Sequence, residues 1–207
     1  MRPLAVLVVF AALAATACSS GSDTAADEQP TTAAQETTPA AETRHFTKAE
    51  LAKLALQPSD APKGMRYTKV DSGPKTLLDV GIVLDDQVAQ IRGMGIRGIY
   101  DATFDSKTTD VRLASRIWLF AEPDGAERWF EKSRSESELY GFEQITAPSL
   151  GQDSWAARGN VGAMVVSYAF RTGNVVVVTT YSTQSQELSE SAAIAAAQRA
   201  AARLQAA

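Results

Sequence analysis

Alternating hydrophobic and polar positions predict a β-hairpin followed by a helix near the middle of the chain. Residues 96–105 alternate, residues 111–121 alternate as well, and a short polar segment joins the two runs. Two such runs separated by a few polar residues are typical of a hairpin. Pro123 then suits the first position of a helix, whose apolar residues recur at core spacing until Gly141.

The second half of the chain repeats this order. Residues 164–171 and 175–181 flank a tight turn at Gly173–Asn174, and an alanine-rich helix is predicted over 187–205. A hairpin followed by a helix therefore occurs twice. The repeat predicts an α+β fold with a mainly antiparallel sheet and its helices packed on one face. Further short strands are predicted at 142–147 and 155–158.

Two helices are predicted before the first hairpin. Thr47 and Glu50 have the spacing of a capping box, which predicts a helix over residues 48–57. Apolar residues then recur at helical intervals through residues 76–92, although Gly81 interrupts them. Residues 44–207 are thus expected to form a single domain with one core.

The first hairpin supplies the candidate ligand-binding residues. If Phe104 pairs with Val111, one face of the hairpin gathers arginines, an aspartate and a tryptophan. Arginine suits carboxylates and phosphates, and tryptophan offers contact area, so this face is predicted to bind an anionic ligand or a protein epitope. The alternative is an ordinary solvated face with cross-strand charge pairs. The expected pairs are Arg97 opposite Trp118, Ile99 opposite Arg116, Asp101 opposite Ala114, and Thr103 opposite Arg112, and the five candidates among them are Arg97, Asp101, Arg112, Arg116 and Trp118.

A short apolar run at the N-terminus predicts export. Residues 4–14 are apolar but number about half of the roughly 20 that a membrane-crossing helix needs. Residues 1–17 therefore read as a cleaved signal peptide. Ordinary cleavage after Ala17 would leave Cys18, the only cysteine, as a free or intermolecularly paired thiol.

Ala17–Cys18 resembles the lipobox of bacterial lipoproteins, although Ala15 stands where leucine is usual. The resemblance implies that Cys18 is lipidated and becomes the N-terminus of the mature chain. One acyl chain binds a membrane only marginally, so the resemblance also implies more than one chain, of the palmitate type. It places the protein on the extracytoplasmic face of the cell membrane, with the membrane as a partner through the lipid anchor.

The composition changes sharply after Cys18. Residues 18–43 are rich in Ser, Thr, Ala and Pro and carry five acidic residues and no basic one, which predicts a disordered acidic tether. Residues 44–207 contain 19 basic and 19 acidic residues, so the net charge of −4 belongs to the N-terminal part. A domain without excess positive charge is unlike a nucleic-acid-binding protein.

The chemistry of the chain is defined by scarce residue types. Its single histidine, His45, lies at the edge of the predicted domain, and Cys18 lies outside it. These two facts exclude Ser-His-Asp and Cys-His catalytic sites and His/Cys zinc sites from the predicted domain. The glycines at 93–98 match GxGxxG but end a predicted helix rather than opening one. We therefore expect no catalytic residue, no metal site and no cofactor.

A second resemblance rests on residues 150–154, residues 170–177 and the alanine-rich terminal helix. These segments, and residues 59–64, are similar to actinobacterial surface lipoproteins with small α+β ectodomains and to extracellular sensor domains of bacterial kinases. The latter are often cross-linked by disulfides, which this chain lacks.

The expected function is a non-enzymatic module of the cell envelope that binds a small ligand or an envelope protein. The alternative is an envelope hydrolase or lipid-active enzyme that uses carboxylate, lysine or tyrosine chemistry. Such an enzyme would require convergent acids or an activated nucleophile in a pocket.

Overall fold

The structure is a computed structural model that describes residues 44–185 and 188–207. The predicted signal peptide, Cys18 and the acidic tether lie outside the described residues, so the structure does not test them. Among the described residues, no helix is long and apolar enough to cross a membrane.

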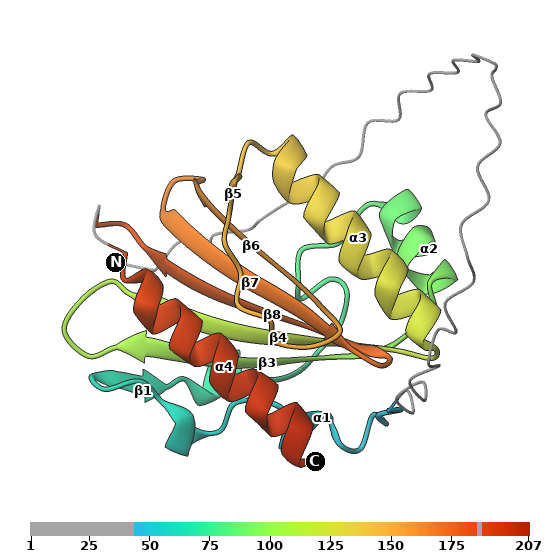
Figure 1. Cartoon of the computed structure of the whole chain (residues 1–207), viewed down its shortest axis with the longest axis horizontal. Helices are drawn as coiled ribbons and strands as arrows, with labels where there is room; N and C mark the ends of the chain where they lie inside the picture. The colour runs from blue at the N-terminus through green and yellow to red at the C-terminus, as the bar shows by residue number, and fades with distance from the viewer. Residues whose placement is uncertain (1–43, 186–187) are drawn as a thin grey trace, which may run out of the picture.

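Eight antiparallel strands form one sheet (Figure 1). The strands are β1 (Met65–Tyr67), β2 (Gly73–Lys75), β3 (Ile96–Ser106), β4 (Arg112–Phe120), β5 (Glu143–Ile145), β6 (Asp153–Asn160), β7 (Met164–Thr172) and β8 (Val175–Thr183). Their order is β1-β3-β4-β8-β7-β6-β5, and β2 also pairs with β3. The two long hairpins, β3–β4 and β7–β8, thus meet through β4 and β8 at the centre of the sheet.

Four helices complete the fold and confirm the predicted α+β class with two hairpin-then-helix units. They are α1 (Leu51–Leu54), α2 (Asp85–Gly93), α3 (Pro123–Leu139) and α4 (Glu190–Ala206), with 3-10 turns η1 (Pro58–Asp60) and η2 (Lys69–Asp71). The expected single helix-covered face needs a correction. Both α3 and α4 pack against β4, β7 and β8, and they do so from opposite faces.

Alternation along β4 shows why both faces need cover. Ile117 and Leu119 lie in the core beneath α4, whereas Trp118 and Phe120 lie in the core beneath α3. Successive side chains of a strand point to opposite faces, and all four of these are apolar and buried. A sheet with two apolar faces must be covered on both.

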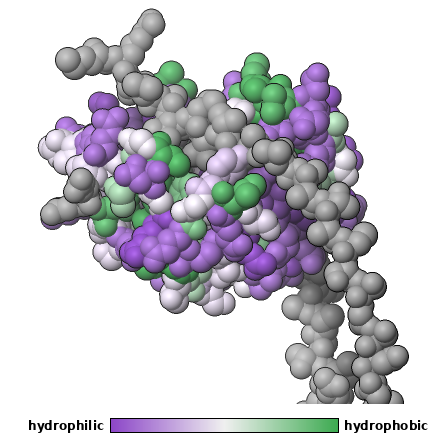
Figure 2. Space-filling model, turned by 90° about the horizontal axis from the view of Figure 1, so that it is seen from above, coloured by the Kyte–Doolittle hydropathy of each residue, from purple (hydrophilic) through white to green (hydrophobic). Residues whose placement is uncertain are grey.

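The two cores differ in the residues that the helices contribute. The α4 side is filled by small alanines such as Ala193, Ala197 and Ala200, which bring the helix close to the sheet. The α3 side contains all three tryptophans of the chain. Figure 2, which views the protein from above, shows hydrophobic residues on the surface as small separate groups among hydrophilic ones.

The predicted helix over residues 76–92 is wrong in its first half, because α2 begins only at Asp85. The Thr76 amide and hydroxyl both donate to the Asp79 carboxylate, at 2.8 and 2.7 Å. Gly81 then adopts a φ of 84°, in the left-handed region that ends a helical path. A polar turn therefore occupies the place of the first two helical turns.

The predicted helix over residues 48–57 is also too long, because α1 covers Leu51–Leu54 alone. Half of the expected capping box forms: the Thr47 amide donates to the Glu50 carboxylate at 2.7 Å. The Thr47 hydroxyl donates to the same carboxylate, and the Glu50 amide donates to the Thr47 carbonyl rather than to its side chain, so the second half of the box does not form.

The pairing of the first hairpin is shifted by two residues from the expected one. Phe104 pairs with Leu113 rather than with Val111. The Ser106 hydroxyl accepts from the amides of Thr108 and Thr109 and so stabilises the turn that goes with this pairing. A shift of two keeps the side chains beyond the bulge on their predicted faces, whereas the bulge between Ile96 and Gly98 places Ile96 with Trp118 in the core beneath α3.

Candidate functional site

An open cleft of about 660 Å³ lies on the α4 side of the sheet, where β5 meets the first turns of α4. Small-ligand sites are usually lined mostly by apolar side chains, with a few polar groups that orient the ligand. This cleft is more polar than that, because half of its ten lining residues are polar or charged. Its lining residues are Glu143, Gln144, Ile145, Thr146, Ala147 and Pro148 from β5 and the following segment, Arg158 from β6, Tyr168 from β7, and Glu190 and Ile194 from α4.

Tyr168 lines the cleft although its side chain is almost wholly buried, with 1% of the residue exposed. Burial raises the pKa of Tyr168, and the nearby Glu190 carboxylate adds to the increase.

Thr179 and Ser115 carry two unpartnered hydroxyls and lie in a row with Tyr168 across the sheet. Tyr168 pairs across strands with Thr179, and Thr179 pairs with Ser115, so the three lie in one line on the same face of the sheet. Thr179 and Ser115 are 0% and 1% exposed, and neither hydroxyl has a hydrogen-bond partner among the described residues. The row leads from the cleft towards the core beneath α4.

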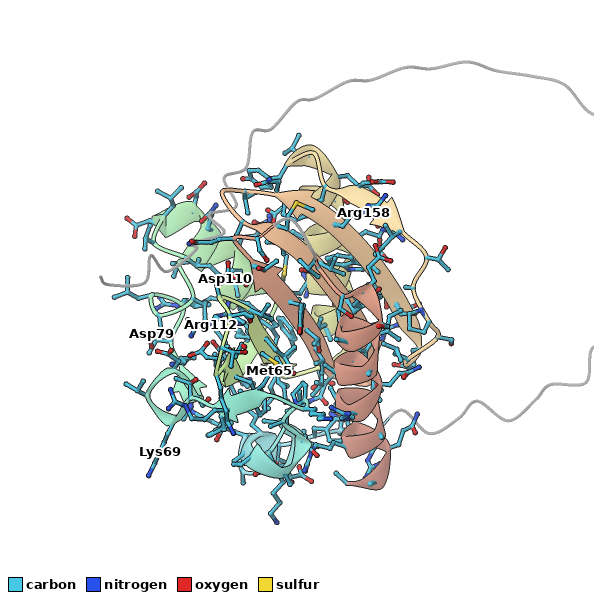
Figure 3. All side chains as sticks on the ribbon, turned by 90° about the vertical axis from the view of Figure 1, so that its left-hand side faces the viewer. Met65, Lys69, Asp79, Asp110, Arg112 and Arg158 are labelled. Atoms are coloured by element: carbon cyan, nitrogen blue, oxygen red, sulfur yellow. The ribbon has the colours of Figure 1, made fainter. Side chains whose placement is uncertain are left out.

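Arg158 holds the mouth of the cleft together by joining three elements. Its Nε and a terminal nitrogen donate to the two Glu143 oxygens at 2.8 and 3.1 Å, and its other terminal nitrogen donates to Glu190 at 3.2 Å. Arg158 lowers the pKa of Glu143 through these contacts. All three side chains are exposed, so the network adds little stability, but it sets the spacing of β5, β6 and α4. Figure 3 shows Arg158 on the side of the sheet that carries α4.

The cleft contains two carboxylates and a tyrosine, which is the composition that hydrolytic chemistry would require. The pKa shifts of Glu143 and Tyr168 run opposite to those that a general acid and a tyrosine nucleophile need. A general acid needs a raised carboxyl pKa, whereas Arg158 lowers that of Glu143. A tyrosine nucleophile needs a lowered pKa, whereas burial raises that of Tyr168. Within residues 44–185 and 188–207, no group of three His, Cys, Asp or Glu side chains is placed to hold a metal ion.

The structure brings Asp101, Arg116 and Trp118, three of the five candidates predicted from sequence, into one cluster on the α3 side. Arg116 forms a bidentate ion pair with the buried Asp101 carboxylate, with both donor–acceptor distances at 2.8 Å. Its guanidinium also lies 5.9 Å from the Trp118 ring centre, and Trp118 packs against Trp129 at 4.6 Å.

The other two candidates lie apart from that cluster. Arg112 pairs with Asp71 at 2.6 Å and with Asp105 at 3.7 Å, towards the far end of the hairpin. Arg97 is exposed beside a β-bulge at the start of β3. Arg112 and Arg116 are thus both neutralised by carboxylates of the domain itself. The ligand-binding role of this hairpin face stays a prediction.

Sequence reasoning missed the cleft because its residues come from four elements that are distant in the chain. Tyr168 and Arg158 stand in predicted strands, and Glu190 stands in a predicted helix. Only the antiparallel pairing of β5, β6 and β7 places them side by side. The one local signal is a tyrosine that alternates with Val166 and Phe170 on the apolar face of β7.

Comparison with known proteins gives one informative likeness. No family model matches the chain, and no curated protein matches it. The fold is similar to the crystal structure of the extracellular domain of PknH from Mycobacterium tuberculosis, with a TM-score of 0.55 and 14% sequence identity over 79% of this chain and 99% of that chain. At this identity the likeness concerns the fold alone. It agrees with the expected similarity to extracellular sensor domains of bacterial kinases.

Proposed function

We propose that the chain is a lipid-anchored extracytoplasmic protein whose domain binds a small ligand in the cleft between β5 and α4, without catalysis. The row of Tyr168, Thr179 and Ser115 that runs inward from the cleft carries this proposal, because the Thr179 and Ser115 hydroxyls are buried without a partner among the described residues. The predicted signal peptide and Cys18 support the location. The fold likeness to an extracellular domain is consistent with it.

The lining of the cleft defines the class of ligand. Ile145, Pro148 and Ile194 offer apolar contact, while Tyr168 offers one buried hydroxyl. The charged groups at the mouth already neutralise one another in part, through Arg158. The cleft thus suits a small ligand with an apolar body and a hydrogen-bonding group at its inner end.

Native mass spectrometry tests the binding. The protein is incubated with an extract of its own cell envelope, washed, and weighed intact; we expect a retained small molecule.

Ala147→Trp fills the cleft and should abolish retention, whereas Ala202→Trp, on the exposed side of α4, should preserve it. Tyr168→Phe should weaken retention about tenfold, since one hydrogen bond is worth about 1.4 kcal/mol. Equal retention by the wild type and Ala147→Trp would refute the proposal.

The anchor is tested separately by metabolic labelling with an acyl precursor. The wild type should incorporate the label, and Cys18→Ser should not. Equal labelling of both proteins would rule out lipidation at Cys18 and would favour the free-thiol alternative. This result would leave the cleft proposal intact, because the two rest on different residues.

The enzyme alternative is favoured by one observation, the meeting of Glu143, Glu190 and Tyr168 in the cleft. A chromogenic acyl ester tests it. Turnover that is lost in Glu190→Gln but kept in Asp124→Asn, an exposed acid of α3, would replace binding by hydrolysis as the function. We expect no turnover above the rate in buffer.

A further inference from the structure

The β1–η2 edge of the sheet gathers exposed cations in a domain that carries no net charge. Lys63, Arg66 and Lys69 are exposed on or beside β1 and η2, and Lys107 is exposed at the tip of the β3–β4 hairpin. The Lys107 amide donates to the Gly64 carbonyl at 3.1 Å, so the hairpin tip lies against the segment that precedes β1. We call these four residues the basic edge.

The cations of the basic edge have no ion-pair partner among the described residues. The neighbouring acids are already engaged: Asp71 and Asp105 contact Arg112, and the Asp110 carboxylate accepts from the amides of residues 184 and 185. The four cations and Arg112, counted against Asp71, Asp105 and Asp110, leave this side of the molecule with a net charge of +2.

Val70 adds an apolar contact to the basic edge. It follows Lys69 in η2 and is 85% exposed, the highest value among the exposed large hydrophobic residues of the described chain. Figure 3 shows Lys69 pointing away from the body of the protein, on the side opposite α4. An outward valine among free cations matches an interface that has anionic head groups above an apolar layer.

We infer that the basic edge docks on an anionic phospholipid surface, with Val70 reaching below the head groups. The charges carry the inference, because this edge keeps a net positive charge, whereas acids such as Glu127, Glu131 and Glu138 are exposed on α3. The short length of chain between Cys18 and the domain also supports docking on the membrane. Only 25 residues separate Cys18 from Arg44, a length that spans about 25–30 Å as a flexible coil. A tether of that length keeps the domain close to the membrane to which Cys18 is proposed to be attached.

A polarity-sensitive dye at position 70 tests the docking. The full chain carries Cys18→Ser, so that the thiol introduced by Val70→Cys is unique and the result does not depend on lipidation. With vesicles of phosphatidylglycerol and phosphatidylcholine, we expect the dye emission to shift to the blue. With vesicles of phosphatidylcholine alone, and with mixed vesicles in high salt that screens the charges, we expect no shift. A dye attached through Leu139→Cys, also exposed but on α3, should not respond.

A charge-reversal pair completes the test. Lys63→Glu with Lys69→Glu should lower the apparent affinity for mixed vesicles at least tenfold, because each cation near an anionic bilayer contributes about a fivefold factor. Arg92→Glu with Arg134→Glu, exposed in α2 and α3, changes the net charge equally away from the basic edge and should have little effect. Melting temperatures show that both variants are folded.

Three outcomes would overturn the inference. They are equal responses at positions 70 and 139, equal responses to both vesicle types, and equal losses from both charge-reversal pairs. A blue shift without vesicles that salt abolishes would assign the basic edge to the acidic segment 19–43 of the same chain, which also overturns docking on lipid. None of these outcomes bears on ligand binding in the cleft.

Discussion

Asn174 lies at the turn between β7 and β8, only 2% exposed, and its side-chain amide makes three hydrogen bonds. The Oδ1 atom accepts from the Phe46 amide at 2.8 Å, while Nδ2 donates to the carbonyls of Phe46 and Phe120 at 3.0 and 2.8 Å. One side chain thus joins the start of the domain to the end of β4. The sequence indicated a turn at Gly173–Asn174, but it did not indicate that this asparagine fastens two distant segments.

Removal of this amide should destabilise the domain. We expect Asn174→Ala to lower the free energy of unfolding by about 2–4 kcal/mol, because it leaves buried backbone groups of Phe46 and Phe120 unpaired. Urea denaturation measures the loss. Asn160→Ala provides the control, since the exposed Asn160 side chain accepts a single bond from Gly162. Similar losses in the two variants would contradict the structural role of Asn174.

Asp110 links the tip of the first hairpin to the end of β8 through its charge. The Thr183 hydroxyl donates to its carboxylate, as do the amides of residues 184 and 185, and these bonds lower the pKa of Asp110. A lowered pKa in the folded state means that the stabilisation is present above the unfolded pKa and is lost as the pH falls through the folded value.

Asp110→Asn should therefore flatten the acid dependence of stability. The urea midpoint of the wild type should exceed that of the variant near neutral pH, and the two should approach each other below about pH 4, where the carboxyl group becomes protonated. Midpoints measured at a series of pH values test this. Curves that stay parallel down to low pH would show that Asp110 contributes nothing through its charge.

At the scale of elements, the start of α3 is held against the end of α2 by a close backbone approach. A Cβ atom at Gly125 would lie 2.0 Å from the Met94 carbonyl oxygen, whereas a Cβ at Gly93 would meet nothing within 4 Å. The two glycines therefore have different roles, although both lie in helices. Sequence alone does not distinguish them.

Gly125→Ala and Gly93→Ala form a matched pair. The first should cost at least about 2 kcal/mol, because the helix must move away from Met94. The second should stabilise the domain by up to about 1 kcal/mol, because alanine is the better helix former. Thermal unfolding followed by circular dichroism measures both. A loss in Gly93→Ala as large as that in Gly125→Ala would contradict the packing described for α2 and α3.

At the scale of the whole molecule, the sheet separates two cores that must fold together if residues 44–207 are one domain. All three tryptophans lie in the core beneath α3, and the alanines of α4 lie in the other core. Tryptophan fluorescence thus reports on one face, while a substitution in α4 disturbs the other. This arrangement makes cooperation between the two faces measurable.

Ala197→Leu tests the cooperation. Its side chain is fully buried between α4 and the sheet, so the larger residue should cost about 1–3 kcal/mol. The tryptophan fluorescence midpoint in urea should fall as much as the circular dichroism midpoint, although no tryptophan lies near the change. Ala202→Leu, which is exposed, should leave both within about 0.5 kcal/mol. A fluorescence midpoint unmoved by Ala197→Leu would show two independent units.

The hydrophobic pattern predicted the long elements well, because alternation and helical spacing are local properties. The strands β3, β4, β7 and β8 and the helices α3 and α4 lie close to their predicted positions. Prediction failed at residues 76–84, where the Thr76–Asp79 hydrogen bonds replace a helical turn. It failed in the register of the first hairpin for a similar reason, since the Ser106 hydroxyl selects the turn.

Sequence by itself determined the α+β class, the balanced charge of residues 44–207 and the scarcity of histidine and cysteine, and it predicts export and an anchor at Cys18. These properties depend on composition and on contacts between near neighbours. Only the tertiary structure decided that helices cover both faces, that Tyr168 lines a cleft with Arg158 and Glu190, and that four free cations share one edge. Each of these depends on strand order, which brings together residues that no local pattern connects.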